Sequence, residues 1–265
     1  MIDMALLQDQ LRLAATASAF DLTRPADRER STRELTSLFY DLQAAVTPTC
    51  FIEIGAHDAR FSKDMATRHP GTKVVAFEGN PNNHAHFAST FDYAAHGVDY
   101  RHALVSDIDG VAEMMLQVRW NGQPFPLIKG SDSLLKRNRE DVEYETREVA
   151  STRLDTAFAD RGATGGLFTL WIDVEGATQQ VFAGAVDTLS NTASIFIEVE
   201  EHPYWENQWL FDDVQAHLAK AGFLALARDF EFEHQFNVVF VHRALWQVAT
   251  VRGALNAYLS RIGRP

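Results

Sequence analysis

Residues 51–62 read FIEIGAHDARFS, in which an apolar strand runs into a turn of small residues and then into a helix. A second apolar strand, Lys73–Phe77, follows this helix and ends on Glu78. An α/β protein uses this order of elements to bind a nucleotide, because the helix N-terminus binds an anionic group and the acid accepts hydrogen bonds from the ribose hydroxyls. The stretch therefore predicts a Rossmann-like fold that binds a cofactor containing a nucleoside.

Strands and helices alternate along the rest of the chain. Residues 167–172 and 194–199 are nearly continuous apolar runs, typical of parallel strands that helices cover on both faces. The apolar spacing between these runs predicts one helix over residues 178–189, while residues 223–232 and 236–242 predict a closing antiparallel pair. We predict an α/β fold with a doubly wound, mostly parallel sheet.

Residues 119–150 differ in composition from the segments on either side. They are rich in turn residues and charge, and they contain few apolar residues for a core of their own. We interpret them as an insertion or lid, with a solvated surface loop as the alternative. The predicted domains are N-terminal helices over residues 1–48, packed on a core domain over residues 49–265 that carries this insertion.

Composition restricts the partners and the location of the protein. A formal net charge of −12 argues against binding nucleic acid or an anionic membrane. No apolar run is long enough to span a membrane, and the single cysteine, Cys50, cannot form an internal disulfide. We expect a cytoplasmic protein that acts on a small molecule.

The turn after the first strand discriminates between cofactors. A dinucleotide-binding turn has the pattern G-x-G-x-x-G, whose second glycine leaves room for a pyrophosphate. Counting from Gly55, the second position is His57 and the third is Arg60. Because a side chain at position 57 obstructs a pyrophosphate, the turn disfavours NAD. It favours a single nucleoside with a small amino-acid tail, as in S-adenosylmethionine.

Several short stretches, in this order along the chain, carry a family resemblance. They are EIGAHDARFS at 53–62, VAFEGNP at 75–81, ALVSD at 103–107, IDVEG at 172–176 and IEV at 197–199. Together they resemble the FkbM family of S-adenosylmethionine-dependent methyltransferases. The resemblance implies the Rossmann-like fold of class I methyltransferases. It also implies O-methylation of a hydroxyl on a sugar or a glycosylated small molecule.

The resemblance further implies a set of cofactor-binding residues. Glu53 or Asp58 would lie near the ammonium of the cofactor, and Glu78 would bind the ribose hydroxyls. Asp107 would accept a hydrogen bond from the adenine amino group. Ser62 would reach the carboxylate or simply cap its helix, and Asp107 has the alternative of a turn residue. The full set is Glu53, Gly55, Ala56, His57, Asp58, Ser62, Glu78, Gly79, Asn80, Ser106, Asp107 and Asp173.

The chain departs from the usual family pattern at two positions of the turn. The family usually has Asn where His57 stands and Gly where Ala59 stands. The methyl group of Ala59 is expected to lie close to the amino-acid tail of the cofactor. This departure leaves an alternative function: a cofactor-binding protein of the same fold with weak or lost catalysis.

The carboxylates at the ends of the later strands are the candidates for catalysis. Asp173 is our predicted general base, a role that contributes roughly 10²–10⁴-fold in rate. His202 is a second candidate catalytic residue, expected in the wall of the acceptor pocket. Alternatively, Asp173 with Glu198 or Glu200 would bind Mg²⁺, which would lower the pKa of the acceptor hydroxyl. We favour the metal-free interpretation.

Two further questions stay open at this point. An N-methyltransferase is an alternative to the O-methyltransferase, since an amine acceptor needs less help from a base. The last predicted helix, through about Arg261, carries apolar residues that would form a homodimer face or cover the sheet.

Overall fold

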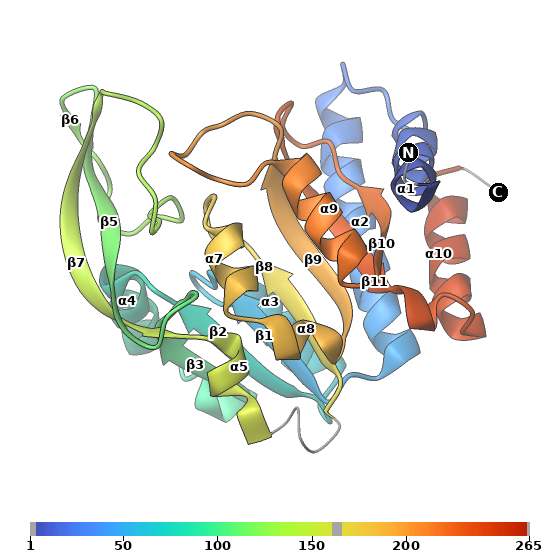
Figure 1. The fold of residues 1–265 in the computed structure, drawn as a ribbon, viewed down its shortest axis with the longest axis horizontal. Helices are drawn as coiled ribbons and strands as arrows, with labels where there is room; N and C mark the ends of the chain where they lie inside the picture. Colours follow the sequence, from blue (N-terminus) through green and yellow to red (C-terminus); the bar gives the residue numbers. More distant parts are fainter. Residues whose placement is uncertain (1–3, 161–165, 264–265) are drawn as a thin grey trace. The chain divides into compact units, whose positions relative to one another are not determined.

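The computed structural model describes residues 4–160 and 166–263 (Figure 1). The chain divides into two compact units. The first comprises Met1–Pro48, Thr192–His202 and Leu210–Pro265, and the second comprises Thr49–Asn191 and Pro203–Trp209. One boundary therefore coincides with the predicted end of the N-terminal helices at residue 48. The predicted division into N-terminal helices and a core domain stays a prediction.

A parallel sheet forms the centre of the second unit. Its strands lie in the order β8-β1-β2-β3, with bounds β1 Cys50–Ile54, β2 Lys73–Glu78, β3 Val98–His102 and β8 Phe168–Ile172. Every residue of β1 and β8 is buried, as their continuous apolar runs predicted. Helices α3 (Arg60–Arg68) and α4 (Pro81–Thr90) follow β1 and β2 and pack on the strands. The parallel pairing brings the carboxyl ends of these strands to one edge.

The second unit also contains a smaller sheet that the sequence did not predict. Its strand order is β4-β7-β5-β6, with bounds β4 Leu104–Val105, β5 Gly110–Trp120, β6 Gln123–Pro124 and β7 Val142–Thr152 (Figure 1). Apolar side chains of Leu104, Met114, Leu116 and Val149 form its core. Of these four residues, Val149 belongs to residues 119–150, so the interpretation of that segment as an insertion or lid stays a prediction, and we keep the name lid for it. The charged residues of β7 are largely exposed. Because a strand with one solvated face carries few apolar residues, its sequence was not recognised as a strand.

The first unit consists of helices and an antiparallel sheet. Its strands lie in the order β10-β11-β9, which confirms the closing antiparallel pair. The bounds are α1 Met4–Ala17, α2 Pro25–Val46, β9 Thr192–Glu200, α9 Phe211–Lys220, β10 Phe223–Arg228, β11 Gln235–His242 and α10 Ala249–Arg261. The last helix, α10, packs on α2, where Arg261 forms ion pairs with Glu34 and Asp41. The homodimer stays a prediction.

Short helices complete the chain. They are η1 Ala94–His96, α5 Leu154–Ala157, α7 Thr178–Ala183, α8 Val186–Ser190 and η2 Arg243–Leu245. The single helix predicted over residues 178–189 is therefore two helices, α7 and α8. They separate at Gly184, where any Cβ atom would overlap the backbone carbonyl of Ser106. Among the described residues, no helix has the length and apolar character needed to cross a membrane.

Candidate functional site

A pocket in the second unit lies at the carboxyl ends of β1, β2 and β8. Predicted cofactor residues in its wall are Gly55, His57, Glu78, Gly79, Asn80 and Asp173. The lid, residues 119–150, adds Lys129, Gly130, Asp132, Ser133 and Leu134 to the same wall. Open α/β sheets bind ligands at this edge. The pocket is therefore the candidate cofactor site.

Gly55 brings the turn after β1 into close contact with the end of β8. Its φ is +79°, and a Cβ atom at this position would overlap the backbone carbonyl oxygen of Asp173. The amide of Asp173 donates a hydrogen bond of 2.9 Å to the carbonyl of Ile54. The glycine thus fulfils the predicted requirement for a tight turn, and Asp173 lies directly beside it.

Glu78 is the buried acid that the sequence assigned to the ribose. Its carboxylate accepts hydrogen bonds from the backbone amides of His57, at 2.6 Å, and Asn80, at 2.7 Å. Burial raises the pKa of Glu78 to about 7, against the hydrogen bonds that lower it. These two amides fix the carboxylate in the pocket wall, where its oxygens can also accept hydrogen bonds from hydroxyl groups.

Glu53 supports the turn from beneath. Its carboxylate accepts a 2.7 Å hydrogen bond from the amide of Ser62, in the first turn of α3. Burial raises the pKa of Glu53 to about 8. The Glu53 carboxylate therefore caps α3, a role that the sequence analysis considered for the Ser62 hydroxyl. As far as the structure describes the pocket, its wall is made of residues other than these two.

The remaining turn residues have structural partners as well. The amide of Ala56 donates to the carbonyl of Phe77 at 2.9 Å, and Asp58 forms a 3.1 Å ion pair with Lys63. Ala59 is fully buried and adopts the left-handed conformation, with φ of +51°. His57 has a φ of +48° and does line the pocket. Ala59 is not among the residues described in the pocket wall.

The two residues predicted at the adenine amino group lie on the chain after β4. Ser106 is buried, and its hydroxyl is hydrogen-bonded to that of Ser151 at 2.7 Å. Asp107 is exposed. In the described part of the chain, this segment contributes its preceding residues, Ala103 to Val105, to the pocket wall.

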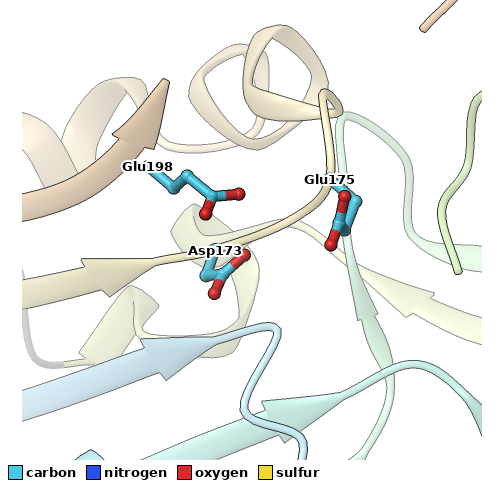
Figure 2. A group of neighbouring side chains, drawn as sticks. All are labelled: Asp173, Glu175 and Glu198. Atoms are coloured by element: carbon cyan, nitrogen blue, oxygen red, sulfur yellow. The ribbon is translucent and has the colours of Figure 1, made fainter. Parts of the chain in front are cut away.

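Two carboxylates of the IDVEG stretch lie in the pocket wall after β8. Figure 2 labels both of them, Asp173 and Glu175, and also labels Glu198 on β9. Glu175 has a φ of +51°, and its carbonyl accepts a 2.7 Å hydrogen bond from the hydroxyl of Ser133. Its carboxylate pairs with Arg137 at 3.7 Å. The lid therefore holds Glu175 through both its backbone and its side chain.

Arg137 and Trp205 form the surroundings of Glu175. The guanidinium carbon of Arg137 lies 4.2 Å from the ring centre of Trp205, which is almost completely buried. Next to Glu175, a Cβ atom on Gly176 would lie 2.6 Å from the Trp205 indole. This close packing explains why the IDVEG stretch ends in glycine.

The remaining catalytic and metal candidates belong to the first unit. Glu198 accepts a 2.8 Å hydrogen bond from Gln235, Glu200 is buried, and His202 is exposed. Asp173 belongs to the second unit. The catalytic role of His202 and the Mg²⁺ site therefore stay predictions.

Several pocket residues escaped the sequence analysis, chiefly Asn83, Lys129, Asp132 and Ser133. Asp132 lies 52 positions from Asn80, its hydrogen-bond partner, so no local spacing relates the two. The only signal was the polar run Lys129-Gly130-Ser131-Asp132-Ser133 inside a segment otherwise interpreted as a lid.

A comparison with known protein families matches residues 53–225 to the methyltransferase FkbM domain. The chain belongs to the FkbM family. It is accordingly an S-adenosylmethionine-dependent methyltransferase, and the α/β fold with a mostly parallel sheet is the one predicted. No protein of curated function matches the sequence.

Solved structures give distant similarities to this FkbM methyltransferase. EvdMO1 is 16% identical with a TM-score of 0.42, covering 82% of this chain, which spans only 40% of EvdMO1. The N-terminal domain of EvdMO1 in the presence of S-adenosylhomocysteine (SAH) and D-fucose is 17% identical with a TM-score of 0.41, covering 83% and 82%. Human N-acetylserotonin methyltransferase in complex with S-adenosylmethionine is 11% identical with a TM-score of 0.39, covering 81% and 53%.

Proposed function

We propose that this FkbM methyltransferase transfers the methyl group of S-adenosylmethionine to a hydroxyl of a sugar or a glycosylated small molecule. The observation that carries the proposal is the position of Asp173, which lines the same pocket as Glu78, the residue predicted to bind the ribose. A hydroxyl is a poor nucleophile until a base removes its proton. A carboxylate beside the cofactor turn supplies that base.

The pocket residues divide into cofactor and acceptor sides. On the cofactor side, Glu78 binds the ribose hydroxyls, and the absence of a side chain at Gly55 lets the nucleoside approach the backbone. Glu53, Ala56, Asp58 and Ser62 hold the turn, while Ser106 and Asp107 flank the adenine end. On the acceptor side, Asp173 is the base and Glu175 contacts the acceptor, with Trp205 behind it.

The reaction then requires little beyond alignment and proton removal. Bound S-adenosylmethionine supplies a methyl group on a positively charged sulfur, open to in-line attack. The acceptor oxygen forms a bond to the methyl carbon as the carbon–sulfur bond breaks, and the hydroxyl proton passes to the Asp173 carboxylate. His202 is a second candidate in the acceptor wall. Mg²⁺ bound by Asp173 with Glu198 or Glu200 is the alternative way to activate the hydroxyl.

Two measurements test the proposal. Calorimetric titration with SAH, with and without Mg²⁺, measures cofactor binding. Transfer of labelled methyl from S-adenosylmethionine to a panel of methyl pyranosides, and to an amine panel, measures the reaction. We expect stoichiometric binding and transfer to a pyranoside hydroxyl. Binding without transfer would favour a protein that has lost catalysis, and transfer only to amines would favour an N-methyltransferase.

Replacing Asp173 tests the role of the base. We expect Asp173→Asn to lower turnover by roughly 10²–10⁴-fold while the dissociation constant for SAH changes little. The exposed acid Asp187, on α8, provides the matched control, and Asp187→Asn should leave turnover unchanged. Turnover that survives in Asp173→Asn would contradict the assignment.

The overall charge supports the class of acceptor. A chain of net charge −12 repels nucleic acid and anionic membrane surfaces, so a small neutral acceptor suits it better. The cytoplasmic location and the homodimer belong to the same proposal.

A further inference from the structure

The lid reaches the ribose side of the pocket through one buried ion pair. Lys129 and Asp132 lie 3.0 Å apart, and their side chains are 9% and 1% exposed. Both residues line the pocket that contains Glu78. Asp132 also accepts a 2.7 Å hydrogen bond from the amide of Gln117 on β5, which ties the pair to the smaller sheet. A buried charge pair in a ligand pocket requires an explanation, because desolvation makes such pairs costly.

Hydrogen bonds connect this pair to the Glu78 carboxylate by two routes. In the first, the Asn80 side chain donates to Asp132 at 2.5 Å, while the Asn80 amide donates to Glu78 at 2.7 Å. In the second, the Asn83 side chain donates to the carbonyl of Lys129 at 2.7 Å and to Glu78 at 3.4 Å. Asn80 and Asn83 are almost completely buried. The position of the lid and the position of Glu78 are therefore coupled.

The charges of the pair act on Glu78 as well. The negative charge of Asp132 raises the pKa of Glu78 in addition to the larger effect of burial. The Lys129 ammonium neutralises Asp132 at 3.0 Å. Among the described residues, other titratable groups around Glu78 include His57 on the turn and Tyr100 and His102 on β3. Asp173 and Glu175, after β8, lie in the same pocket wall.

We propose that Lys129 and Asp132 are positioning residues of the cofactor site: both hold Glu78 in place, and Lys129 offsets the negative charge of Asp132 so that Glu78 stays ionised for the ribose hydroxyls. This inference rests on the proposed ribose-binding role of Glu78. Two ribose hydroxyls donate to one carboxylate best when it is ionised. Loss of the Lys129 charge leaves Asp132 uncompensated and disfavours the ionised form, while loss of the Asp132 charge has the opposite effect.

The test is the pH dependence of SAH binding, measured by calorimetry from pH 5.5 to 9. In Lys129→Gln we expect the pH at which affinity falls to half to rise by about one unit, with binding at pH 7 weakened about fivefold. In Asp132→Asn we expect that pH to move downward, and in the double variant to return toward the unmodified protein. The histidines are the same in all variants, so their titration cancels in the comparison.

A matched control and a folding measurement accompany these variants. Lys136 is an exposed lid cation, and Lys136→Gln should leave the pH profile unchanged. Thermal melting reports whether each variant folds. Should Lys129→Gln fail to fold, Asp132→Asn still tests the proposal, because its expected shift is downward and a merely structural defect has no reason to give it.

The possible results separate this inference from the proposed function. Opposite pH shifts in the two single variants support it. If the unmodified protein binds SAH, two results in the variants would overturn the inference and leave the proposed methyltransferase function intact. They are an equal loss of SAH affinity at every pH and an unchanged pH profile. No SAH binding by the unmodified protein at any pH would overturn both.

Discussion

The turn after β1, residues 55–59, and the lid, residues 119–150, both contribute to the pocket but depend on different kinds of contact. The turn depends on backbone conformation and backbone hydrogen bonds: glycine at 55, left-handed residues at 57 and 59, and the amides of Ala56 and His57, which donate to Phe77 and Glu78. The lid depends on partners far along the chain, such as Asn80, 52 positions from Asp132, and Glu175, 42 positions from Ser133.

This difference determines what each region tolerates. The turn is restricted by backbone conformation and by close approach of another strand, which one added carbon atom can prevent. The lid is restricted by side-chain charge and hydrogen bonding, and losing one such contact lowers the free energy of unfolding by less. Substitutions in the turn should therefore cost more than substitutions of similar size in the lid.

The largest effect is expected for Gly55→Ala. The new Cβ atom would overlap the carbonyl oxygen of Asp173, and the backbone φ of +79° disfavours alanine. We expect a loss of about 3 kcal/mol or more in the free energy of unfolding, together with loss of SAH binding. Urea denaturation and calorimetry measure the two quantities.

Gly71→Ala is the matched control for this substitution. Gly71 lies in the turn before β2, and a Cβ atom there would have no neighbouring atom within 4 Å. It should fold and bind SAH as the unmodified protein does. If Gly55→Ala behaved like Gly71→Ala, the turn would be more adaptable than the lid and the comparison would be wrong.

A smaller effect is expected in the lid for Arg137→Met. The substitution keeps an unbranched side chain over Trp205 but removes the cation that pairs with Glu175 at 3.7 Å. Since the side chains of Arg137 and Glu175 are 17% and 16% exposed, we expect a loss of about 1–2 kcal/mol in the free energy of unfolding. Urea denaturation measures this loss.

The same substitution two positions further along provides the control. Arg139 is exposed and pairs with Asp141, so Arg139→Met should leave the midpoint of unfolding unchanged. Equal loss in both variants would mean that the contact with Glu175 has no special weight. A loss in Arg137→Met as large as that in Gly55→Ala would remove the distinction between lid and turn.

The same contrast explains what could be predicted from the sequence. The strands, the turn and the position of Glu78 at the end of β2 follow from local patterns, namely apolar runs, glycine and an acid at a strand end. The strand β7 was missed because residues 142–148 are mostly charged and exposed, so that the apolar face of the strand is too sparse to recognise. Lys129 and Asp132 lie three positions apart, but they were missed because their contacts with Asn83 and Asn80 are determined by the folded chain.

Ala59 is the position at which the local pattern and the structure suggest different consequences. The family pattern places a glycine here, and the sequence predicted that the alanine methyl group would crowd the cofactor. The structure gives Ala59 a φ of +51° and full burial at the start of α3, and the described pocket wall lies elsewhere. The left-handed conformation costs an alanine about 1–2 kcal/mol, partly offset by the greater freedom of glycine in the unfolded chain.

For Ala59→Gly we therefore expect the smallest effect and one of opposite sign, a gain of about 0.5–1 kcal/mol in the free energy of unfolding. Affinity for SAH should stay unchanged in calorimetry. Ala85→Gly, at an exposed position inside α4, makes the same change in a right-handed helix and should instead lose about 1 kcal/mol. Tighter SAH binding in Ala59→Gly would place the methyl group against the cofactor. The alanine that replaces the usual glycine of the family would then weaken cofactor binding, and would not act through the backbone conformation of the turn.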